Sequence, residues 1–114
     1  MRAAIALLTL ALASCGHETI DEATCPPGGT KLTDEVFGKQ FFSGHCNSGH
    51  SAETKLRQGA PDNYVFSTRA QIVEHKDRIF ERSAGTNDSM PPGPDDPAIE
   101  ERDKLAEWLV CGAP

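Results

Sequence analysis

The positions of its four cysteines constrain the fold of this chain more than any other feature of its sequence. They stand at residues 15, 25, 46 and 111 of 114. A chain of this length forms one small domain, and the apolar core of such a domain gives only marginal stability. A covalent cross-link or a bound cofactor would therefore supply a large share of the stability. Which cysteines serve either purpose depends on the N-terminal segment.

The N-terminal segment predicts export. Met1-Arg2 supplies a positive charge, and the apolar run 3–13 is too short to span a bilayer. The run ends in Leu12-Ala13-Ser14-Cys15, which resembles the lipobox of bacterial lipoproteins. The resemblance implies that residues 1–14 are a signal peptide and that lipidated Cys15 anchors the protein to a bacterial membrane, on its periplasmic or cell-surface side. The alternative is an ordinary secretory signal that happens to contain a cysteine, and both interpretations imply export.

Lipidation of Cys15 would leave an odd number of cysteines in an oxidising compartment. The simplest assignment is a disulfide between Cys25 and Cys111, which ties the start of the domain to its end and leaves Cys46 unpaired. Closing so long a loop stabilises a fold by roughly 4–5 kcal/mol in the chain-entropy model. In the alternative, Cys46 pairs with one of the other two and the third is free.

The charge balance narrows the classes of partner. The full chain has a formal net charge of −6, which becomes −7 when Arg2 leaves with the signal peptide, and only 6% of its residues are aromatic. An acidic chain with few aromatic side chains is a poor candidate for binding nucleic acid. It suits a soluble exported domain.

Hydrophobic periodicity predicts an all-α domain over residues 31–114, with three main helices and long loops, after a tether and leading loop at 15–30. We expect helices at about 34–45 after the N-cap Thr33, at about 69–82 after Ser67 or Thr68, and from Pro97 to just before Gly112. A close crossing by another helix would explain Gly38 inside the first. The expected inner faces comprise Val36, Phe37, Gln40, Phe41 and Phe42; Ile72, Val73, Ile79 and Phe80; and Ile99, Arg102, Leu105, Ala106, Trp108, Leu109 and Val110.

The segment Cys46-Asn47-Ser48-Gly49-His50 follows the first predicted helix. It is one residue short of Cys-x-x-Cys-His, the c-type haem attachment signature, in which two thiols bond the haem vinyl groups and the histidine binds the iron. Gly49 stands at the second thiol position. Met90, the only methionine other than Met1, lies in a proline-rich loop. A methionine thioether is a common second iron ligand opposite histidine.

The order of these segments resembles the small monohaem cytochrome c domain. Its landmarks are Phe37-Gly38, the segment from Cys46 to His50, Met90-Pro91-Pro92 and the stretch 105–109, which together span most of residues 31–113. The resemblance implies a cytochrome c-like fold whose first and last helices cross above a c-type haem. It also implies that His50 is the proximal iron ligand, Met90 the distal ligand and Cys46 a thioether link. Gly49 has no thiol, so at most one thioether is expected.

The leading hypothesis is therefore a lipid-anchored monohaem electron carrier, not an enzyme, that exchanges electrons with redox partner proteins. Haem bound through Cys46 alone, haem bound without a covalent bond and loss of haem all stay open. Loss of haem would make the chain a haem-free exported lipoprotein, used for binding or structure, on the same scaffold. A third hypothesis is a small copper or zinc module built from His45, Cys46 and His50, with or without Met90, although adjacent His45 and Cys46 diverge on a helix.

Overall fold

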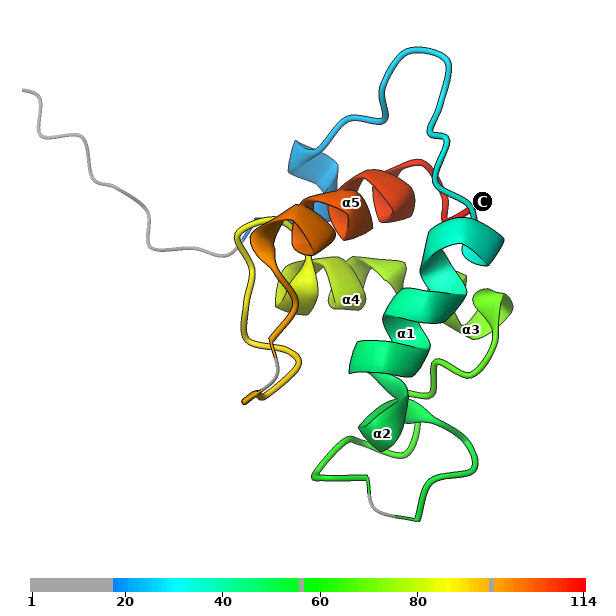
Figure 1. Ribbon diagram of the computed structural model, residues 1–114, viewed down its shortest axis with the longest axis vertical. Helices are drawn as coiled ribbons and strands as arrows, with labels where there is room; N and C mark the ends of the chain where they lie inside the picture. The colour runs from blue at the N-terminus through cyan, green and yellow to red at the C-terminus, as the bar shows by residue number, and fades with distance from the viewer. Residues whose placement is uncertain (1–17, 56, 95) are drawn as a thin grey trace, which may run out of the picture.

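The computed structural model describes residues 18–55, 57–94 and 96–114. The predicted signal peptide and Cys15 lie outside these residues. The described part of the chain is all-α, as expected, and contains no strand (Figure 1). Within it, no helix combines the length and the apolar character that a membrane span requires.

The first predicted helix consists of three consecutive pieces. A π-helical turn, η2 (Asp34–Gly38), leads into α1 (Lys39–His45), and α2 (Asn47–His50) follows Cys46 directly. Thr33 is the N-cap, as predicted, and its hydroxyl accepts a hydrogen bond from the Val36 backbone N–H at 3.2 Å. The prediction that Val36 faces inward is wrong, because its side chain is 62% exposed. A π-turn rotates the chain less per residue than an α-turn, which shifts this position off the buried stripe.

The second predicted helix is divided at His75. The two parts are α3 (Arg69–Glu74) and α4 (Lys76–Ser83), and His75 between them has φ −105° and ψ 14°. Thr68 caps α3 by accepting from the Gln71 backbone N–H. The prediction of one continuous helix is therefore wrong. The break occurs where the His75 ring packs against Tyr64 and Phe66, with ring centroids 4.9 and 5.8 Å apart.

The last helix, α5 (Ile99–Val110), begins later than predicted. Ala98 is extended, with ψ 155°, so Pro97 precedes the helix instead of opening it, and Ile99 is 52% exposed instead of buried. Gly112, at φ +90°, follows the helix in the left-handed conformation that favours glycine.

Trp108 lies at the centre of the core, where α5 meets the first helical segment. It is fully buried, its ring centroid lies 6.0 Å from that of Phe37 and 6.1 Å from that of Phe42, and its indole N–H donates to the carbonyl of Pro114. A Cβ added at Gly38 would lie 2.5 Å from the Trp108 ring. This is the close approach that the glycine suggested.

The N-terminal part of the described chain is joined to the same core. Cys25 and Cys111 form the predicted disulfide, with their Cα atoms 4.9 Å apart. The short turn η1 (Ile20–Glu22), which falls in the expected tether, packs against α4 and α5 and buries Ile20. The side-chain amide of Asn87 pairs with both the N–H and the carbonyl of Glu18, each at 2.9 Å. The domain therefore includes residues from at least Glu18 onward.

Candidate functional site

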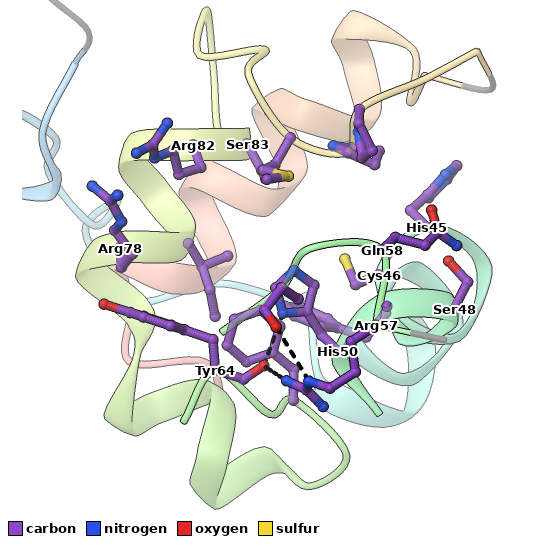
Figure 2. Close-up of a pocket in the computed structure, with 18 of the residues that line it drawn as sticks. His45, Cys46, Ser48, His50, Arg57, Gln58, Tyr64, Arg78, Arg82 and Ser83 are labelled. Atoms are coloured by element: carbon purple, nitrogen blue, oxygen red, sulfur yellow. Dashed lines mark hydrogen bonds between the residues drawn. The ribbon is translucent and has the colours of Figure 1, made fainter. Parts of the chain in front are cut away.

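A cavity of about 490 Å³ lies between the α1–α2 junction and α4 (Figure 2). This volume falls within the range of roughly 300–1,000 Å³ typical of small-molecule and cofactor sites. Its walls include Phe42, Cys46, His50, Tyr64, Phe66 and Ile79, and the loop 90–94 closes another side. Cys46, His50 and Met90, the three residues that the sequence singled out, all line it.

Cys46 and His50 lie one helical turn apart. The His50 backbone N–H donates to the carbonyl of Cys46 at 3.0 Å, which places both side chains on one face of the α1–α2 junction. Figure 2 shows the Cys46 sulfur and the His50 ring facing the same hollow, with α4 opposite. The local helical geometry therefore directs a thiol and an imidazole into one cavity.

The surroundings of His50 fix the orientation of its ring. Its Nδ1 lies 2.8 Å from the carbonyl oxygen of Tyr64, and its ring stacks on Phe66 with centroids 4.5 Å apart. A carbonyl oxygen can only accept, so Nδ1 carries the proton and Nε2 has the free lone pair. No hydrogen bond engages Nε2 within the described residues. This is the arrangement in which histidine binds a metal ion through Nε2.

Cys46 is the free cysteine of the described chain. The protein around it raises the pKa of its thiol to about 12, because burial disfavours the thiolate more than the positive charge of Arg102 favours it. The group is therefore a neutral thiol at pH 7.

Met90 reaches the cavity from a distant part of the sequence. It lies in the loop between α4 and α5, and its side chain is 37% exposed. Its backbone N–H donates to the carbonyl of Arg82 at 2.8 Å, which ties the loop to the end of α4. Met90 and His50 thus approach one cavity from separate elements.

Gly49, at the position of the missing thiol, is buried against the loop that follows α2. A Cβ built there would lie 3.2 Å from the carbonyl oxygen of Arg57, closer than most such contacts. A cysteine at this position would require the loop to move by a few tenths of an ångström. The absence of a side chain at position 49 therefore allows the loop around Arg57 to lie where it does.

Arginine side chains shape the edge of the cavity, which the sequence did not reveal. Arg57 donates to the carbonyls of Pro61 and Tyr64 at 2.8 and 3.1 Å, so Tyr64 accepts from both Arg57 and His50. Arg78 and Arg82, one turn apart on α4, also line the cavity. The partners of Arg57 are backbone carbonyls, which leave no sequence pattern.

The hypothesis of a copper or zinc module gains no support. No group of three or more histidine, cysteine, aspartate or glutamate side chains suited to a metal ion occurs within residues 18–55, 57–94 and 96–114. His45 instead pairs with Glu101 of α5, with Nε2 and the carboxylate oxygen 3.3 Å apart. His45 therefore lines the same cavity as His50, but its Nε2 already has a partner in Glu101.

Comparison with known proteins gave no relative: no family model matches the chain, and neither the curated proteins nor the solved structures contain a significant match. The case for a function therefore rests on the cavity and on the residues that line it.

Proposed function

We propose that this chain is a lipid-anchored monohaem electron carrier with a cytochrome c-like fold. In this proposal His50 and Met90 would hold the haem iron through Nε2 and the thioether sulfur, and Cys46 would form a single thioether with the macrocycle. A bound haem would supply a one-electron Fe(II)/Fe(III) couple. The protein itself would carry out no chemical transformation. It would exchange electrons with redox partner proteins at a bacterial membrane.

One observation carries the proposal: Cys46, His50 and Met90 line the same cavity although two separate elements contribute them. His50 is held by Tyr64 with Nε2 free, as an iron ligand requires. The cavity walls are largely apolar and aromatic around Phe42, Phe66 and Ile79, which suits a flat macrocycle.

The state of Cys46 in the folded domain bears on when a thioether could form. A thioether forms when the S–H group adds across a vinyl double bond, the sulfur bonding one carbon and the hydrogen the other, with no net oxidation. The raised pKa of Cys46 keeps the thiol protonated and poorly nucleophilic in the folded domain. We therefore expect attachment to take place before the chain folds around this residue.

Positive charges at the cavity edge suit the two carboxylates of haem. Guanidinium groups pair well with carboxylates, and Arg78 and Arg82 at the cavity edge are candidate partners for the two haem carboxylates. The acidic balance of the rest of the chain would steer it towards basic redox partners, at rates that fall as salt rises.

Two histidines of the same segment provide a matched test. His50→Ala should abolish haem binding, because it removes the proximal ligand, whereas His45→Ala should retain haem, because His45 pairs with Glu101. The measurement is haem content per protein after expression in a host that matures c-type cytochromes. Unchanged haem content in the His50 variant would refute the assignment of the proximal ligand.

A haem-free lipoprotein is the second candidate, and Gly49 is the observation that favours it. The attachment signature lacks one thiol, and the Arg57 carbonyl lies where a side chain at position 49 would need room. In this candidate the cavity serves another apolar ligand or none. Wild-type protein without haem from a competent host would favour it over the electron carrier.

A further inference from the structure

A buried arginine holds the loop that carries Met90. Arg102 of α5 is only 4% exposed, and its Nη1 lies 2.9, 3.1 and 2.8 Å from the carbonyl oxygens of Ser83, Asn87 and Met90. Its own carbonyl accepts from the N–H of Gly85 at 2.9 Å. Arg102 thus connects α5, the end of α4 and the Met90 loop through one side chain.

The charge of Arg102 is not neutralised locally. No carboxylate forms an ion pair with it within the described residues, and its buried Nη2 has no hydrogen-bond partner there. Burying an unpaired cation is costly, and a sequence that needed only packing at this position would do better with an apolar side chain. The guanidinium does more than fill the core, because it holds three backbone carbonyls from two segments.

The contacts at Met90 suggest what that role is. The N–H of Met90 donates to the carbonyl of Arg82, and the carbonyl of Met90 accepts from Arg102, so the peptide groups on both sides of its Cα are fixed. Only the side-chain torsions stay free. A fixed backbone directs the thioether into the cavity at a small entropic cost.

We propose that Arg102 is a positioning residue that holds Met90 ready to bind the haem iron and that its buried positive charge favours the reduced iron. The inference rests on the proposed electron carrier. Its guanidinium donates directly to the Met90 carbonyl, so the charge lies within hydrogen-bond distance of the loop that carries the proposed ligand. A positive charge at this loop without a carboxylate partner would destabilise Fe(III) relative to Fe(II) in a bound haem and would thereby raise the reduction potential.

The test uses the full exported protein with Arg102→Met, Arg102→Lys and, as a matched control, Arg69→Met. Arg69 also donates to backbone carbonyls, those of Ala113 and Gly112, but at the C-terminus. In the haem-free form, amide hydrogen exchange at Met90 should become roughly tenfold faster in Arg102→Met, the effect of losing about one hydrogen bond. In Arg69→Met it should be unchanged.

The haem-loaded form provides the second readout. Arg102→Met should weaken the far-red sulfur-to-iron charge-transfer band of the ferric protein, as Met90→Leu abolishes it, and should lower the reduction potential. Arg102→Lys keeps the charge but loses the planar fork, so it should keep most of the potential while Met90 still exchanges faster. A merely structural role would not separate the reduction potential from the exchange rate at Met90 in this way.

The outcomes separate the two proposals. Unchanged exchange at Met90 in both Arg102 variants would overturn the positioning role, whether or not haem binds. Wild-type protein that takes up no haem, with accelerated exchange in Arg102→Met, would overturn the electron carrier and leave Arg102 as a loop clamp alone. If Arg102→Met fails to fold, Arg102→Lys decides: wild-type exchange and an unaltered band in that variant would overturn the positioning role.

Discussion

Each end of this domain is stabilised by a different kind of interaction. The closed end, formed by the Cys25–Cys111 disulfide, Phe37, Gly38 and Trp108, combines a covalent bond with tight apolar packing. At the cavity end, around His50, Arg57, Met90 and Arg102, arginine side chains and one histidine instead bind backbone carbonyls.

The difference indicates which part of the fold needs a ligand. The closed end buries its side chains against one another, so it should form without a partner. The cavity end surrounds about 490 Å³, and hydrogen bonds to backbone carbonyls hold the loops that border it. Anything that binds the folded state alone stabilises it by mass action, and such a ligand would act on the cavity end.

Removing the disulfide should produce the largest change in stability. Cys25→Ser with Cys111→Ser opens a loop with a sequence separation of 86 residues. The free energy of unfolding should fall by about 4–5 kcal/mol on the chain-entropy model, measured by denaturant titration. A loss below about 1 kcal/mol would mean that packing around Trp108 alone holds the closed end.

Alkaline pH should weaken the cavity end through Cys46. Because burial raises the pKa of this thiol from 9.0 to about 12, its contribution to stability is complete below pH 9 and is lost as pH rises towards 12. The loss should not exceed about 4 kcal/mol, since each pKa unit corresponds to about 1.4 kcal/mol. The measurement is the free energy of unfolding of the haem-free protein against pH, compared with Cys46→Ala. Equal slopes for the two proteins between pH 9 and 12 would contradict the raised pKa of the Cys46 thiol.

Replacing two glycines of the first helical segment by alanine should change the stability of the fold in opposite directions. Gly38→Ala would place a Cβ against the Trp108 ring and should destabilise the fold by about 1–3 kcal/mol. Gly44→Ala meets nothing within 4 Å and should stabilise α1 by about 0.5–1 kcal/mol. Thermal unfolding of both variants measures the contrast. A neutral Gly38→Ala would show that the crossing is looser than described.

Local signals in the sequence predicted most of the closed end. Thr33 was predicted as a cap, and Thr68 as one of two candidates with Ser67, because an N-cap acts on residues two or three positions away. Leu105 and Trp108 were predicted because helical periodicity marks a buried face. The break at His75 was missed because the apolar periodicity continues through it, whereas the rings that His75 contacts, Tyr64 and Phe66, come from a separate segment.

At the cavity end, too, some residues were predicted from the sequence and others were missed. Cys46, His50 and Met90 were predicted as a set, since their residue types and order carry a chemical pattern. The roles of Arg57 and Arg102 were not predicted, because their partners are the carbonyls of residues such as Tyr64 and Met90. Any residue type offers such a carbonyl, so the sequence holds no signal for the pairing.

The most direct test of the proposed function is haem staining of the exported protein after a denaturing gel, with a pyridine haemochrome spectrum from the same sample. The proposal predicts haem that survives denaturation, with a spectrum between those of haem with two free vinyl groups and haem with two thioethers. Cys46→Ala should lose the stain on the gel. Absence of haem from protein made in a host able to mature c-type cytochromes would contradict the electron carrier and favour the haem-free lipoprotein.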